Sequence, residues 1–282
     1  MPLTVSPRST TGAGRRIRNG RVAVVIAVLS LGLLGCRVSV SPLQNRIAVG
    51  GEPFVIFVGE GEDGAGDLFA AAAAGGTVHP ITFTRLHETM PQLAPNGTTV
   101  AFLRSRRAAD SAEYRVVVLN LLNGAERTLF RASNDELIRH IGWSVEGTTL
   151  YVATNVGVYM LAPPPAGAAA VAVPMSSRAG ADSAFRVYVG SPAFAEVRAC
   201  SWKGIESALC VYPRANTEAL FVPGGHDPVR WGSDSIGYVR QGDLEVRPLG
   251  SGRVRRVVLT SAPRHLQMPS YFSGQSRRIA GE

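Results

Sequence analysis

Lysine is nearly absent from this chain: Lys203 is the single one among 282 residues, so the basic character comes from arginine. Charged residues are also few, at 18%, whereas apolar residues make up 45%. That composition can form a sizeable core and excludes global disorder. The formal net charge is +8, but five arginines and no acid lie in residues 1–35, and the remainder carries only +3. Such a small charge attracts phosphates weakly, so we expect no nucleic-acid partner.

A short apolar run follows these arginines. Residues 22–35, VAVVIAVLSLGLLG, are uncharged and precede Cys36. The run has the length of a signal-peptide core and is shorter than the roughly 20 residues of a transmembrane helix. Its end, Leu33-Leu34-Gly35-Cys36, resembles the lipobox of bacterial lipoproteins. The resemblance implies cleavage between Gly35 and Cys36 and a diacylglyceryl group on the Cys36 thiol; an uncleaved anchor or a plain secretory signal is the alternative.

Beyond Cys36, short β-rich runs alternate with turns of Gly, Pro, Asn and Ser, without intervening amphipathic helices. This pattern predicts an all-β fold. Five segments align as a strand with a bulky last residue, a polar turn and a second strand. They are LAPNGTTVAF (93–102), WSVEGTTLYV (143–152), WKGIESALCV (202–211), WGSDSIGYV (231–239) and FSGQSRRIAG (272–281). Their bulky residues, called anchors below, are Leu93, Trp143, Trp202, Trp231 and Phe272.

The anchors recur on average about every 45 residues, the length of a four-stranded propeller blade. A further pair of strands with a Gly turn follows some hairpins, as in residues 67–82, 116–130 and 243–260. These units resemble the TolB-like propeller repeat over about residues 50–282. The resemblance implies a β-propeller of five to six four-stranded antiparallel blades, with six favoured and the anchors in the core. The last hairpin either completes the first blade or belongs to a chain truncated at Glu282.

Two cysteines remain if Cys36 is lipidated. The repeat alignment places Cys200 opposite Cys210, as Ile141 is placed opposite Tyr151 in the better-formed copy. Directly opposed residues on one face lie close enough for a disulfide. We therefore predict a disulfide between Cys200 and Cys210, with two buried free thiols as the alternative.

Three patterns could indicate chemistry, and each is weak. Gly59, Gly61 and Gly64 match G-x-G-x-x-G, but neighbouring acids would repel a pyrophosphate. Those acids also fit no EF-hand calcium loop. The five histidines show no metal-ligand spacing, and neither the His226-Asp227 pair nor the turn around Ser233 forms a triad or a G-x-S-x-G motif. We expect no catalytic residues, cofactor or metal.

The predicted organisation is a lipoprotein signal peptide over 1–35, a lipidated Cys36 with a short linker over 36–49, and a propeller over 50–282. We expect a lipid-anchored protein of the cell envelope, on its periplasmic or extracellular face. We expect it to act as a non-catalytic binding or scaffold module for a protein, peptide or glycan. Ligand contact is expected at a propeller mouth, where loops converge. The alternative is the propeller portion of a hydrolase or lyase of the prolyl-oligopeptidase or oligogalacturonate-lyase type that lacks its catalytic part.

Overall fold

The computed structural model describes residues 42–107, 112–133, 135–162, 171–177, 185–186, 189, 195–213 and 219–274. The predicted signal peptide, with Gly35 and Cys36, lies outside these ranges, so cleavage and lipidation stay predictions. Within the described ranges, no helix is long and apolar enough to cross a membrane.

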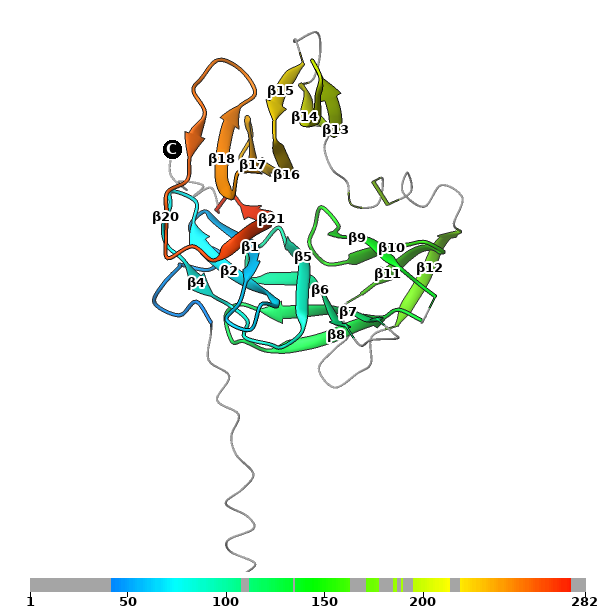
Figure 1. Ribbon diagram of the computed structural model, residues 1–282. Coiled ribbons are helices and arrows are strands. Elements are labelled where there is room, and N and C mark those ends of the chain that lie inside the picture. The colour runs from blue at the N-terminus through cyan, green and yellow to red at the C-terminus, as the bar shows by residue number, and fades with distance from the viewer. Residues whose placement is uncertain are drawn as a thin grey trace, which may run out of the picture. The chain divides into compact units, whose positions relative to one another are not determined.

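Nearly all regular structure in these ranges is β-strand, as predicted, and most strands belong to five antiparallel sheets (Figure 1). Sheet 1 contains, in spatial order, β21 (Arg264–Phe272), β1 (Phe54–Glu60), β2 (Gly66–Ala72) and β4 (His79–Pro80). Sheet 2 contains β5 (His87–Leu93), β6 (Thr99–Arg107), β7 (Ala112–Asn120) and β8 (Glu126–Arg131). Sheet 3 contains β9 (Ile138–Trp143), β10 (Leu150–Thr154), β11 (Gly157–Leu161) and β12 (Ala172–Ser177).

Two more sheets follow along the chain. Sheet 4 contains β13 (Ala195–Trp202), β14 (Ile205–Pro213) and β15 (Leu220–Pro223). Sheet 5 contains β16 (Gly225–Trp231), β17 (Ser235–Arg240), β18 (Asp243–Pro248) and β19 (Arg255–Arg256). A short parallel ladder pairs β20 (Leu259–Thr260) with β3 (Gly76–Thr77). β20 follows sheet 5 in the chain, and β3 lies in the connection between β2 and β4 of sheet 1.

The last strand of the chain completes the first sheet. In Figure 1 the red strand β21 lies beside the blue strand β1. Their antiparallel register places Phe272 opposite Phe54 and Arg264 opposite Glu60. The first strand of the last predicted hairpin therefore completes sheet 1, which is the first of the two alternatives given for that hairpin. Its predicted second strand lies outside the described residues.

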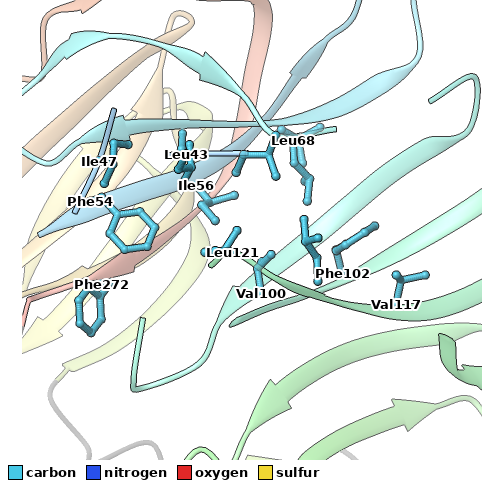
Figure 2. Close-up of a cluster of buried hydrophobic side chains, with 14 residues drawn as sticks. Leu43, Ile47, Phe54, Ile56, Leu68, Val100, Phe102, Val117, Leu121 and Phe272 are labelled. Atoms are coloured by element: carbon cyan, nitrogen blue, oxygen red, sulfur yellow. The ribbon is translucent and has the colours of Figure 1, made fainter. Parts of the chain in front are cut away.

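Strand β1 is buried on both faces, because its sheet packs between two others. Side chains alternate across a strand. Phe54 and Ile56 join a cluster with Val100 and Phe102 of sheet 2 (Figure 2). Val58 belongs to the same cluster. The alternate residues Val55 and Phe57 join a second cluster with Trp231, Val239 and Leu244 of sheet 5. Leu43 and Ile47, in the predicted linker, are also buried in the first cluster.

The same alternation continues through the stack. In sheet 2, Ala101 and Leu103 turn away from sheet 1 and pack with Trp143 and Leu150 of sheet 3. Sheets 4 and 5 meet through a further cluster, formed by Leu209, Val211, Val222, Ile236 and Tyr238. The clusters join sheet 1 to sheet 2, sheet 2 to sheet 3, sheet 4 to sheet 5 and sheet 5 to sheet 1. Antiparallel sheets that pack on one another in this way, with the last strand completing the first sheet, are typical of a β-propeller. Five sheets are described, one of them three-stranded, and the number of blades stays a prediction.

All five anchors occupy one topological position. Each is the last residue of the first strand of its sheet in spatial order: β5, β9, β13, β16 and β21. The strand that follows is offset from the predicted register, however. Tyr151 pairs with Gly142 instead of Ile141, and Leu150 pairs with Trp143. The turn between β9 and β10 is one residue longer than predicted, since the Ser144 amide donates to the Thr149 carbonyl at 2.8 Å.

Candidate functional site

The structure joins Cys200 and Cys210 by a disulfide, with their Cα atoms 5.9 Å apart. The predicted direct opposition of the two residues is wrong. Cys200 pairs with Ala208 and Cys210 pairs with Arg198, so the cysteines are diagonal neighbours on one face of sheet 4. A Cα separation of this size lies within the range that a disulfide spans.

A tighter turn explains the shifted register. The hairpin β13–β14 turns through Lys203 and Gly204, whose φ angles are 48° and 80°. Positive φ at both central residues is typical of a two-residue type I′ turn. An irregularity between Cys200 and Trp202 then shifts the ladder by one residue. Because a one-residue shift moves a side chain to the other face, this irregularity places both sulfurs on the same face.

The weak motifs gain no support from their surroundings. Gly59, Gly61 and Gly64 lie in and after the end of β1, in the hairpin leading to the antiparallel strand β2, whereas a dinucleotide fingerprint needs a strand followed by a helix. The described residues contain no group of three His, Cys, Asp or Glu side chains arranged to hold a metal. His226 Nδ1 lies 3.1 Å from Asp227 Oδ2, and Ser233 is exposed in the turn after β16.

The first strands of neighbouring sheets are linked to one another. The Met268 amide of β21 donates to Asp227 of β16 at 2.9 Å. The Leu93 amide of β5 donates to Ser270 of β21 at 2.8 Å. The Trp143 indole of β9 donates to the Gln92 carbonyl at 2.9 Å. Each of these contacts joins two first strands: β16 to β21, β21 to β5, and β5 to β9.

Three of these strands carry a feature that the repeat pattern does not predict. Met90, Asp227 and Met268 have φ angles of 53°, 49° and 49°, and each precedes a proline. The registers of β5, β16 and β21 are irregular near these positions. Bulges of this kind redirect the strand. The sequence signal is a residue-proline pair three or four positions before the anchor, as in MPQL, DPVRW and MPSYF.

A buried ionic cluster lies where sheet 2 begins. Glu88 of β5 is fully buried, and its Oε1 accepts from Arg104 Nε at 2.8 Å and from the Thr84 hydroxyl at 3.1 Å. Arg104 of β6 also binds both carboxylate oxygens of Glu126, at 2.7 and 2.9 Å. The second oxygen of Glu88, Oε2, is buried without a hydrogen-bond partner.

Burial dominates the electrostatics of this cluster. It raises the pKa of Glu88, and the positive charge of Arg104 offsets only part of that effect. Burial likewise raises the pKa of Asp67, which accepts from the Thr84 amide at 3.1 Å. The groups of the cluster bind one another and join β2, β5 and β6 to the β4–β5 connection, so we assign the cluster to stability.

Two pockets meet at one tyrosine and form the candidate binding site. Tyr271, at the end of β21, lines both. Its ring stacks on the buried Trp231 of β16, with ring centroids 4.2 Å apart and an angle of 22° between the planes. The first pocket, of about 580 Å³, is lined by Arg230, Gly232, Ser233, Tyr271 and Ser273. The second, of about 420 Å³, is lined by Glu52, Pro53, Ala72, Ala73, Ala74, Trp231, Arg255 and Tyr271.

The pockets combine an aromatic centre with arginines. Tyr271 is half-buried, and burial raises the pKa of its hydroxyl, although the charge of Arg255 opposes this. The hydroxyl is therefore a protonated donor at neutral pH. Arg230 holds the carbonyl of Gly232 through Nε at 3.0 Å. Such a site can bind a ligand with apolar and hydrogen-bond-accepting groups. The repeat pattern predicts Trp231 in the core, and no sequence motif points to the other lining residues as binding residues.

No protein-family model matches this chain, and no curated protein resembles it in sequence. Solved structures with a similar course of the chain include TolB from Acinetobacter baumannii, at 7% identity and a TM-score of 0.47, covering 77% of this chain and 66% of that one. The β-propeller domain of the Trilobed protease from Pyrococcus furiosus has 13% identity and a TM-score of 0.24, over 64% and 58%. Acylaminoacyl peptidase from Pyrococcus horikoshii has 12% identity and a TM-score of 0.30, over 77% and 45%. The matched regions span less than two thirds of each of these structures, and the similarities assign no activity to this chain.

Proposed function

We propose that this chain is a lipid-anchored binding module of the cell envelope that catalyses no reaction. Cys36 carries the lipid, and the propeller holds a protein, peptide or glycan in the two pockets that meet at Tyr271. The observation that supports the binding role is the pocket pair itself: two adjoining cavities share an aromatic side chain that a buried tryptophan holds in place. Ligand sites typically combine such an apolar surface with a few polar groups.

Site-directed photo-crosslinking in intact cells tests the position of the site. A photo-reactive amino acid replaces Ser233, which is exposed and lines the larger pocket. The matched control replaces Glu146, which is exposed in the corresponding first turn of sheet 3. We expect a crosslinked partner from position 233 and none from position 146. Equal crosslinking from both positions, or from neither, would place the ligand elsewhere.

The anchor is tested by Cys36→Ala. Loss of the thiol prevents lipidation, so the variant should accumulate as an unprocessed precursor, whereas the wild-type protein fractionates with membranes. Stable anchoring requires more than one acyl chain, which a diacylated cysteine provides. Normal processing of the variant would remove the lipoprotein assignment without affecting the binding role.

Catalysis is tested separately with the purified protein. The proposal expects no turnover of peptide, ester or polyuronate substrates above a buffer control. Hydrolysis of a peptide or ester that a single Ser→Ala substitution abolishes would favour the alternative, a propeller portion of a hydrolase.

A further inference from the structure

The arginines around the pocket pair outnumber the acids. Residues 225–274, which include sheet 5, β20 and the closing strand β21, contain seven arginines, four acids and no lysine. Two of the acids already have arginine partners: Glu245 accepts from Arg240 at 2.7 Å, and Asp243 accepts from Arg256 at 2.6 Å. This part of the protein is therefore electropositive beyond its own ion pairs.

One of these arginines faces the pocket without a carboxylate of its own. Arg255 and Arg256 are neighbours in β19, opposite Val246 and Glu245. Successive strand residues point to opposite faces, so the pairing of Arg256 with Asp243 leaves Arg255 on the other face. There Arg255 lines the smaller pocket beside Tyr271 and has no ion-pair partner among the described residues.

Apart from Glu52, the other residues that line the smaller pocket are apolar, so the pocket offers few groups for sugar hydroxyls. Ala72, Ala73, Ala74 and Pro53 form one wall of the smaller pocket. Glu52 is the only carboxylate among its lining residues, and its Oε1 already accepts from the Ala48 amide at 2.6 Å. Trp231 has only 6% of its surface exposed, so it presents no flat face on which a sugar ring could stack.

Resting on the proposed binding role, we infer that the pockets beside Tyr271 bind a protein segment in which acidic and apolar residues alternate. One carboxylate of the segment binds the Arg255 guanidinium, and the Tyr271 hydroxyl donates to it as well. Guanidinium and carboxylate form paired, charge-assisted hydrogen bonds. Apolar side chains of the segment pack on the alanine wall, and the larger pocket, with Arg230 and the two serines, takes the continuation of the segment.

Fluorescence anisotropy with synthetic probes tests this ligand class. Three fluorescein-labelled probes are used: a nonapeptide of alternating glutamate and leucine, a nonapeptide of alternating lysine and leucine, and a short chain of galacturonic acid. The protein is the whole mature chain. We expect saturable, salt-sensitive binding of the glutamate probe and at least tenfold weaker binding of the lysine probe. Equal binding of both probes would overturn the inference, as would binding of the galacturonic acid chain without binding of the glutamate probe.

A matched pair of variants locates the contact. Arg255→Gln should weaken binding of the glutamate probe about tenfold, the effect of losing one charge-assisted hydrogen bond. Arg253→Gln removes the same charge from an exposed position that does not line either pocket, and it should change affinity less than twofold. Tyr271→Phe should weaken binding by a smaller factor than Arg255→Gln. Equal losses of affinity in Arg255→Gln and Arg253→Gln would overturn the proposed Arg255 contact, because net charge alone would then account for binding.

The two proposals fail in different ways. Crosslinking from position 233 combined with no binding of the glutamate probe would overturn the ligand class and leave the binding module standing. Absence of crosslinking together with absence of probe binding would overturn both.

Discussion

At the scale of single residues, Glu88 makes stability depend on pH. Burial raises its pKa above the ordinary value of 4.5. The folded protein therefore holds a proton to higher pH than the unfolded chain does, and the free energy of unfolding falls as pH rises between the two pKa values. Below both pKa values, the contribution of Glu88 to the free energy of unfolding does not change with pH.

Glu88→Gln keeps the shape of the side chain and removes this titration. We expect the free energy of unfolding of the variant, minus that of the wild type, to increase with pH by about 1.4 kcal/mol for each pH unit of that window. Urea unfolding at several pH values between 4 and 8 measures the difference. Glu126→Gln removes the exposed carboxylate that shares Arg104. The free energy of unfolding of this variant should still fall with rising pH, as it does for the wild type. Parallel curves for wild type and Glu88→Gln would contradict the prediction.

The disulfide is the second prediction at this scale. Mass spectrometry of exported protein, alkylated without reductant, should find Cys200 and Cys210 unmodified and joined. In the chain-entropy model a loop of about eleven residues contributes roughly 2.5–3 kcal/mol, so Cys210→Ala should lower the free energy of unfolding by about that amount. The reduced wild-type protein is the control and should unfold like the variant. Two alkylated thiols without reductant would rule the disulfide out.

At the scale of elements, two turn glycines allow the cost of backbone strain to be measured separately from the cost of a packing clash. Gly97 has a φ of 66°, and a Cβ there would lie 2.6 Å from the ring of Phe272. Gly232 has a φ of 70°, and a Cβ there would meet nothing within 4 Å. Both positions disfavour a side chain through their φ angle, by about 1–2 kcal/mol, but only Gly97 also contacts the closing strand.

Gly97→Ala should therefore destabilise the protein by about 1–3 kcal/mol more than Gly232→Ala, because the core must shift around an added methyl group. Chemical denaturation of the two variants measures this difference. Equal losses would mean that the Phe272 ring moves without cost and that the turn does not fix the closing strand.

At the scale of the whole molecule, closure by β21 should decide whether the first sheet forms. Strand β21 supplies Leu266 and Phe272 to the two clusters on either side of β1. A chain that ends at Pro263 should lose cooperative thermal unfolding and bind a dye for exposed apolar surface. A synthetic peptide of residues 264–274 should restore part of the cooperativity. A wild-type melting temperature for the shortened chain would contradict this role.

Much of the fold follows from local sequence pattern. Alternating apolar residues specify strands, and Gly-containing turns specify hairpins, so the repeat predicts the all-β class and the topological position of all five anchors. The assignment of Trp143 and Trp231 to the core is of this kind, since both are buried. These features depend on residues close together in the chain.

The remaining features depend on contacts between distant parts of the chain. The pairing of Phe54 with Phe272 joins residues from opposite ends of the propeller, and no local pattern identifies such partners. The register of Cys200 and Cys210 depends on a turn and a one-residue irregularity that together shift the ladder. The site at Tyr271 exists because β21 and β16 belong to different sheets that meet when the chain closes. The repeating unit follows from local sequence alone, whereas contacts between units form the candidate binding site.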